Sequence, residues 1–110
     1  MNFVPLFSMT VTDPITGTVH VVLSRESIAR CKQDLVGFMG MWVRRASSLP
    51  DGAAKQYAIF CGWNYEITGL VFGERRTVEQ GPVSSIPLPP IATIMNPMWI
   101  GLCNQEREPL

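Results

Sequence analysis

The clearest pattern of apolar and polar residues lies between Ser24 and Ser47 and predicts one long amphipathic helix over residues 25–46. Apolar side chains recur there every three or four residues, so they share one face of a helix. Ser24 is expected to cap the N-terminus with its hydroxyl, and the Leu49-Pro50 pair is expected to end the helix. The predicted buried stripe contains Ile28, Cys31, Leu35, Phe38, Met39 and Trp42, with Val36, Val43 and Ala46 beside it.

The outer face of this helix changes character halfway along. It begins with Arg30 and Asp34, whose opposite charges at a spacing of four suit a solvated surface. It continues with Gly37, Gly40 and Met41, although glycine inside a helix costs about 1 kcal/mol relative to alanine. Two interpretations stay open: the glycines are a tolerated weak point, or a second layer of chain packs against them.

The chain before the helix shows the alternation of a β-hairpin over residues 1–23. Its turn is predicted at residues 13–17, where aspartate, proline and glycine each favour a reversal of the chain. In the second strand, alternation places the side chain of His20 on the face opposite Val21.

Three more strands are predicted after the helix. Residues 56–63 are apolar on both faces, which is typical of a central strand that is covered on both sides. Residues 65–72 form the next strand, in which Gly69 indicates a bulge or a close approach of backbone. Residues 75–80 are polar and suit a short edge strand.

From Gly81 onward the composition changes to a proline-rich arm. Five prolines fall between Pro82 and Pro97, so the arm is predicted to be extended. The residues between them are too apolar for a solvated linker. The arm therefore either wraps its own domain or offers a contact surface to a neighbouring molecule. Residues 104–110 are polar and are expected to fray.

Together these elements predict an α+β fold. It contains a small antiparallel sheet of four to five strands in the order ββ-α-ββ(β), with one long helix packed on a face and an extended arm at the C-terminal end. Residues 1–81 form the α+β domain. Residues 82–110 form the arm and the polar tail, as part of the same single domain.

The amino-acid composition limits the classes of partner that are expected. The 110 residues carry nine basic and nine acidic side chains and are only 16% charged, so no net field points toward nucleic acid or an anionic membrane. Low charge near neutrality favours self-association. The apolar run over residues 35–43 is far shorter than the ~20 residues of a membrane span, so no span is expected.

Candidate chemistry is sparse. Cys31, Cys61 and Cys103 are widely spaced and odd in number, which fits neither a disulfide framework nor a metal-binding pair. We expect the first two to be inert core residues, Cys103 to be accessible, and His20 to be an ordinary sheet residue. No phosphate-binding loop or paired carboxylate is indicated. The sequence therefore predicts no catalytic residue, metal or cofactor, and a reducing, cytoplasmic setting.

The function that these observations favour is non-catalytic interaction or assembly through apolar protein–protein contacts, as in a small viral or phage accessory or structural protein. The expected partner is a protein, including a second copy of the chain in a homo-oligomer, and not a nucleic acid. The predicted partner-binding residues are Gly37, Gly40, Met41, Ile86, Leu88, Ile91, Ile94, Met95 and Trp99.

Two alternatives stay open. The first is a small-ligand-binding or enzymatic domain with a pocket between helix and sheet, near Trp42 and Trp63. The second is a nucleic-acid-binding module that uses two arginine pairs, at residues 44–45 and 75–76.

Overall fold

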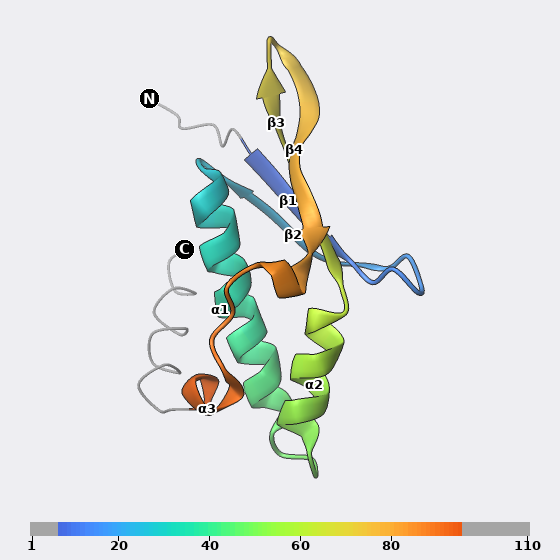
Figure 1. The fold of residues 1–110 in the computed structure, drawn as a ribbon, viewed down its shortest axis with the longest axis vertical. Coiled ribbons are helices and arrows are strands. Elements are labelled where there is room, and N and C mark those ends of the chain that lie inside the picture. Colours follow the sequence, from blue (N-terminus) through green and yellow to red (C-terminus); the bar gives the residue numbers. More distant parts are fainter. Residues whose placement is uncertain (1–6, 96–110) are drawn as a thin grey trace.

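A computed structural model describes residues 7–95 and confirms the predicted α+β class (Figure 1). A four-stranded antiparallel sheet in the order β2-β1-β3-β4 packs against a layer of helices. The elements are β1 (Phe7–Thr12), β2 (Val19–Arg25), α1 (Ile28–Ala46), α2 (Gly52–Cys61), β3 (Asn64–Val71), β4 (Glu74–Pro82), the 3₁₀ helix η1 (Val83–Ser85) and α3 (Ile91–Ile94).

The predicted N-terminal hairpin is present as β1 and β2. Its turn forms as expected, because the Asp13 carboxylate accepts a hydrogen bond of 2.9 Å from the Ile15 amide, and Gly17 adopts a φ of 75°. Gly69 in β3 lies under the ring of Phe7: a Cβ added there would come within 2.8 Å of that ring. The close approach at Gly69 is therefore made by a side chain of the neighbouring strand, whereas the sequence predicted an approach of backbone. The predicted polar edge strand is also confirmed, as β4.

The long helix is confirmed, but its start is not where the sequence placed it. Ser24 belongs to β2, where it pairs with Ser8, so its prediction as the N-cap is wrong. The N-cap is Ser27, whose hydroxyl accepts a hydrogen bond of 3.1 Å from the Arg30 amide. Two serines three residues apart offer the same capping chemistry, and the length of β2 decides between them.

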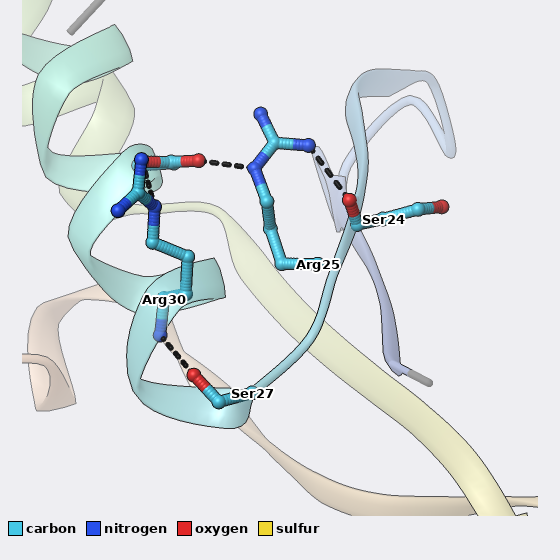
Figure 2. A network of polar contacts seen from close by, with 5 residues as sticks. Ser24, Arg25, Ser27 and Arg30 are labelled. Atoms are coloured by element: carbon cyan, nitrogen blue, oxygen red, sulfur yellow. Dashed lines mark hydrogen bonds and ion pairs between the residues drawn. The ribbon is translucent and has the colours of Figure 1, made fainter. Parts of the chain in front are cut away.

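A polar network fixes the connection between β2 and α1 (Figure 2). The Arg25 guanidinium forms an ion pair with the Asp34 carboxylate and also donates to the Ser24 carbonyl at 2.7 Å. Arg30, four residues before Asp34, approaches the other carboxylate oxygen at 3.3 Å. Asp34 is thus held by two arginines from the last residue of the strand and the first turn of the helix. The pair of Arg30 and Asp34, predicted on a solvated face, therefore takes part in the connection between β2 and α1.

The predicted central strand over residues 56–63 is wrong, because residues 56–61 belong to α2 and β3 begins only at Asn64. A short apolar run without clear alternation fits a buried strand and a packed helix equally well. Ala53, Ala54 and Lys55 just before it are good helix formers, which favours the helix. Asp51 adopts a φ of 55° directly before this helix. The sheet consequently has four strands, and β1 and β3 occupy its centre.

The core lies between the sheet and the helices. Met9, Val11 and Ile67 of the central strands are fully buried, as are Leu35 and Met39 of α1. The helix α2 packs beside α1 and contributes the fully buried ring of Phe60. These contacts leave the outer part of α2 and the far end of the β3–β4 hairpin outside the core.

The described part of the arm lies against its own domain. It is extended only in part, because η1 and α3 interrupt it, and the prediction of an entirely extended arm is therefore wrong there. The helix α3 begins directly after Pro90, where a proline no longer obstructs the helical hydrogen bonds. It contacts both α1 and α2. The Tyr57 hydroxyl of α2 also donates a hydrogen bond of 3.2 Å to the Pro89 carbonyl.

Candidate functional site

The residues predicted to bind a partner divide into buried and half-buried positions. Gly37 and Gly40 are buried in α1, and Met41 is half-buried. In the arm, the Ile86 and Ile94 side chains are buried in the core of the same molecule. These buried side chains hold the arm to its own domain. The remaining four are Leu88, Ile91 and Met95, which are half-buried, and Trp99, which lies outside the described residues.

An open hollow of about 510 Å³ lies where α1, α2 and the start of β2 meet. We call it the aromatic hollow. It includes Trp42 and Trp63, the two residues at which the sequence placed an alternative pocket. Its lining residues are His20, Trp42, Arg45, Ala46, Gln56, Ile59 and Trp63.

Three rings line the hollow, and a fourth, that of Phe60, packs behind them. The Trp63 indole, which is only 5% exposed, stacks on the His20 imidazole with ring centres 4.1 Å apart and planes at 4°. The edge of Trp42 meets the Trp63 ring at 5.5 Å and 81°. The buried Phe60 ring lies 5.1 Å from Trp63 and 5.6 Å from Trp42. Stacked and edge-to-face contacts at these separations are favourable, so the wall is preformed.

His20 reaches this wall because the register of β2 shifts at that residue. Val21 pairs with Val11, but Val19 pairs with Thr12, so His20 is the extra residue of a β-bulge. A bulge re-aims a side chain that simple alternation would place on the other face. The prediction that His20 lies opposite Val21 assumed regular alternation, and the stacking of His20 on Trp63 results from the bulge.

The electrostatics of the hollow are one-sided. Arg45, in the last turn of α1, lies at its rim, and none of the seven lining residues carries a carboxylate. Within residues 7–95, Arg45 takes part in none of the ion pairs. The hollow therefore offers apolar aromatic walls next to one positive charge. This combination suits an apolar group that is accompanied by an acid.

A second exposed feature lies at the turn between β3 and β4. Val71 pairs with Glu74, so Phe72 and Gly73 form a two-residue loop. Both have positive φ, 50° and 80°, as in a type I′ turn. The Phe72 side chain is fully exposed, and Leu70 nearby is more than half exposed. We call Leu70, Phe72 and Gly73 the hairpin tip.

The sequence reasoning missed the hairpin tip and the role of Arg45. The signal for the tip was available: Phe-Gly stands between two strands at a place where Asn-Gly or Asp-Gly is usual. The convergence of Arg45 with His20 and Gln56 carried no local signal, because these residues come from three elements.

The two described cysteines are poorly suited to nucleophilic chemistry. Burial raises the pKa of the Cys31 and Cys61 thiols, which keeps them protonated. Both are free thiols, Cys31 buried and Cys61 half-buried, and Cys61 lies in α2 instead of the predicted strand. Cys103 lies outside the described residues.

Among residues 7–95, no group of three or more histidine, cysteine, aspartate or glutamate side chains is placed to hold a metal ion. In the same part of the chain, no helix has the length and apolar character needed to cross a membrane. Comparison with protein families, with curated proteins and with solved structures finds no match to this chain.

Proposed function

We propose that this protein is a non-catalytic assembly protein that associates with further copies of itself through apolar contacts. The observation that carries the proposal is the position of Phe72. Its ring is fully exposed, and its backbone has a left-handed φ that a bulky residue seldom adopts.

Phe72 does little for the stability of its own fold. Burying a phenylalanine side chain contributes about 1.5–3 kcal/mol, and the exposed ring obtains none of this within its own molecule. The turn itself would favour asparagine at this position. A residue that neither packs nor suits its backbone is expected to serve a contact with another molecule.

The charge balance supports association between identical copies. Nine basic and nine acidic residues give a formal net charge of zero, so copies do not repel each other at long range. Leu70 adds apolar area on the same hairpin. An isolated exposed apolar residue is ordinary, but an aromatic ring at a protruding turn is a typical interface anchor.

Light scattering coupled to size-exclusion chromatography over a concentration series tests the proposal. The wild type is expected to show a mass above that of the monomer, and Phe72→Asn is expected to weaken the association. Asparagine suits the turn, so this variant removes the ring without a cost in folding. Val22→Thr, which alters an exposed apolar residue of β2, is the matched control and should associate like the wild type. A wild type that stays monomeric, or equal association of Phe72→Asn and the wild type, contradicts the proposal.

The aromatic hollow favours a second candidate function, the binding of a small molecule. Its volume of about 510 Å³ lies within the usual range for ligand sites, and its walls are largely apolar. Native mass spectrometry distinguishes the two functions: a monomer that retains a small molecule supports ligand binding.

A further inference from the structure

We infer that the Phe72 ring of one copy binds in the aromatic hollow of a second copy. The inference rests on the proposed function and adds the receiving surface. It joins two features of the described chain: an exposed aromatic ring and a hollow with a preformed aromatic wall.

The apolar parts are complementary. The half-buried Trp42 and the exposed His20 present ring surface to the opening, with Trp63 packed behind them. Ile59 and Ala46 add aliphatic groups. A phenyl ring entering this space can make the edge-to-face contacts that aromatic side chains prefer. The hollow is larger than one ring, so the inference includes contact of Leu70 with its rim.

One complementary pair of charges can form beside the ring, although Arg75 and Arg76 follow the acid on the same hairpin and make the turn region positive overall. Glu74 follows Phe72 by two residues and is well exposed, while Arg45 stands at the rim of the hollow. Glu74 forms a 2.6 Å ion pair with Arg76, and both side chains are more than 60% exposed. Such an exposed pair contributes little stability, so Glu74 can exchange Arg76 for Arg45 at little cost. The acid beside the ring is the group that the positive rim lacks.

The arrangement requires two molecules. The turn between β3 and β4 lies at one end of the molecule, while the end of α1 and the start of α2 lie at the other (Figure 1). The tip therefore cannot fold back into its own hollow without unfolding the sheet. A contact between different surfaces of identical copies is head-to-tail, and it builds a ring when the rotation closes or a filament when it does not.

This geometry allows a complementation experiment. Phe72→Asn lacks the tip, and Ile59→Glu places an acid at the receiving site, where it opposes both the apolar ring and Glu74. Each variant alone is expected to be monomeric by light scattering. An equimolar mixture is expected to form a 1:1 heterodimer and nothing larger, because one intact tip meets one intact hollow. Circular dichroism verifies that both variants are folded.

An exchange of charges tests the ion pair. Arg45→Glu should weaken association about tenfold or more, because it replaces an attraction with a repulsion. Adding Glu74→Arg to the same chain should restore most of the loss. Arg44→Glu is the matched control: it is an exposed neighbour on α1 that does not line the hollow, and it should change association about threefold at most.

The outcomes separate the two proposals. If the wild type associates and Phe72→Asn prevents it, while the mixture stays monomeric or Ile59→Glu associates normally, the receiving site lies elsewhere and only the inference is wrong. If Arg44→Glu and Arg45→Glu weaken association equally, the assigned ion pair is wrong. A wild type that is monomeric at all concentrations overturns both the inference and the proposed function.

Discussion

The helices α1 and α2 lie side by side, but the burial of their side chains follows a helical pattern in the sequence only in α1. The side chains of α1 follow a helical period and bury one stripe against the sheet. In α2 only Gly52 and Phe60 are buried, although seven of its ten residues are alanine, isoleucine, phenylalanine, tyrosine or cysteine. Apolar content alone therefore says little about which side chains are buried, and periodicity says much more.

The difference has a physical cause. A helix that covers a sheet needs a continuous apolar stripe, and such a stripe leaves a regular pattern in the sequence. The helix α2 instead packs against α1 and contacts α3 and η1, while its outer surface contributes Gln56 and Ile59 to the aromatic hollow. Ile59, the large exposed apolar residue of α2, lines this hollow, so its position does not follow the pattern of a core.

The largest effect expected from this comparison is at Phe60. Under the strand interpretation, Phe60 and Ile59 would both be buried, on opposite faces. In the helix, Phe60 is fully buried and Ile59 is 51% exposed. Phe60→Ala should therefore lower the free energy of unfolding by about 3–5 kcal/mol. Ile59→Ala should lower it by less than about 1 kcal/mol. Urea unfolding measures both, and equal losses would restore the strand interpretation.

Much of the fold could be predicted from the sequence, because its signals are local. The long helix follows from its apolar stripe, and the first hairpin from Asp13, Gly17 and the alternation around them. The errors arose where tertiary context decides. Ser24 and Ser27 are equivalent as caps until the length of β2 is known. The run at residues 56–63 is compatible with two structures, and the packing of α2 against α1 selects one.

The next largest effect on stability is expected at the junction between α1 and α2. A Cβ added to Gly52 would lie 1.8 Å from the Ala46 carbonyl oxygen, so the backbone must move to admit it. Gly52→Ala should therefore destabilise the protein by about 1–3 kcal/mol. Gly62→Ala, at the other end of α2, is the control. Gly62 has a helical φ of −82° and 3.4 Å of space, and alanine there should be neutral or stabilise by up to about 1 kcal/mol.

The midpoints of thermal and urea unfolding of the two glycine variants test this expected difference in stability. If Gly52→Ala were as stable as Gly62→Ala, α1 and α2 could not approach each other as closely as they do. That result would also weaken the geometry of the aromatic hollow, since Ala46 belongs to its lining.

The candidate site was less predictable than the fold. Trp42 and Trp63 stood out as aromatic residues, and the sequence placed an alternative pocket beside them. The position of His20, which stacks on Trp63, depends on a bulge, and a register shift in one strand leaves no clear trace in a short sequence. The exposed ring of Phe72 could have been recognised, because its left-handed conformation follows from the two-residue loop.

The smallest expected effect on stability is electrostatic and comes from an ion pair made by α1. Lys32 of α1 forms an ion pair with Glu79 of β4, and the Tyr65 hydroxyl donates to the same carboxylate at 2.6 Å. The hydrogen bond from Lys32, followed by that from Tyr65, lowers the pKa of Glu79. The hydrogen bond to Glu79 raises the pKa of Lys32. The pair connects the edge strand β4 to α1.

The signs of these shifts fix the pH dependence. A lowered pKa at Glu79 means that its contribution to stability is complete above the ordinary glutamate value and is lost as the pH falls through the lowered pKa. A raised pKa at Lys32 means that its contribution is complete below the ordinary lysine value and is lost as the pH rises through the raised pKa. The pair therefore stabilises the fold across the neutral range. Both side chains are about one third exposed, so we expect less than about 1 kcal/mol.

Urea unfolding of the wild type and Glu79→Gln over a range of pH measures this contribution. The variant should be slightly less stable near neutral pH, and the difference should shrink to zero in acid, where Glu79 of the wild type is itself neutral. In a Lys32→Met background, Glu79→Gln should cost less at neutral pH, because the pair is already broken. A difference that grows as the pH falls would show that Glu79 is destabilising when charged, and that α1 and β4 are held together by packing alone.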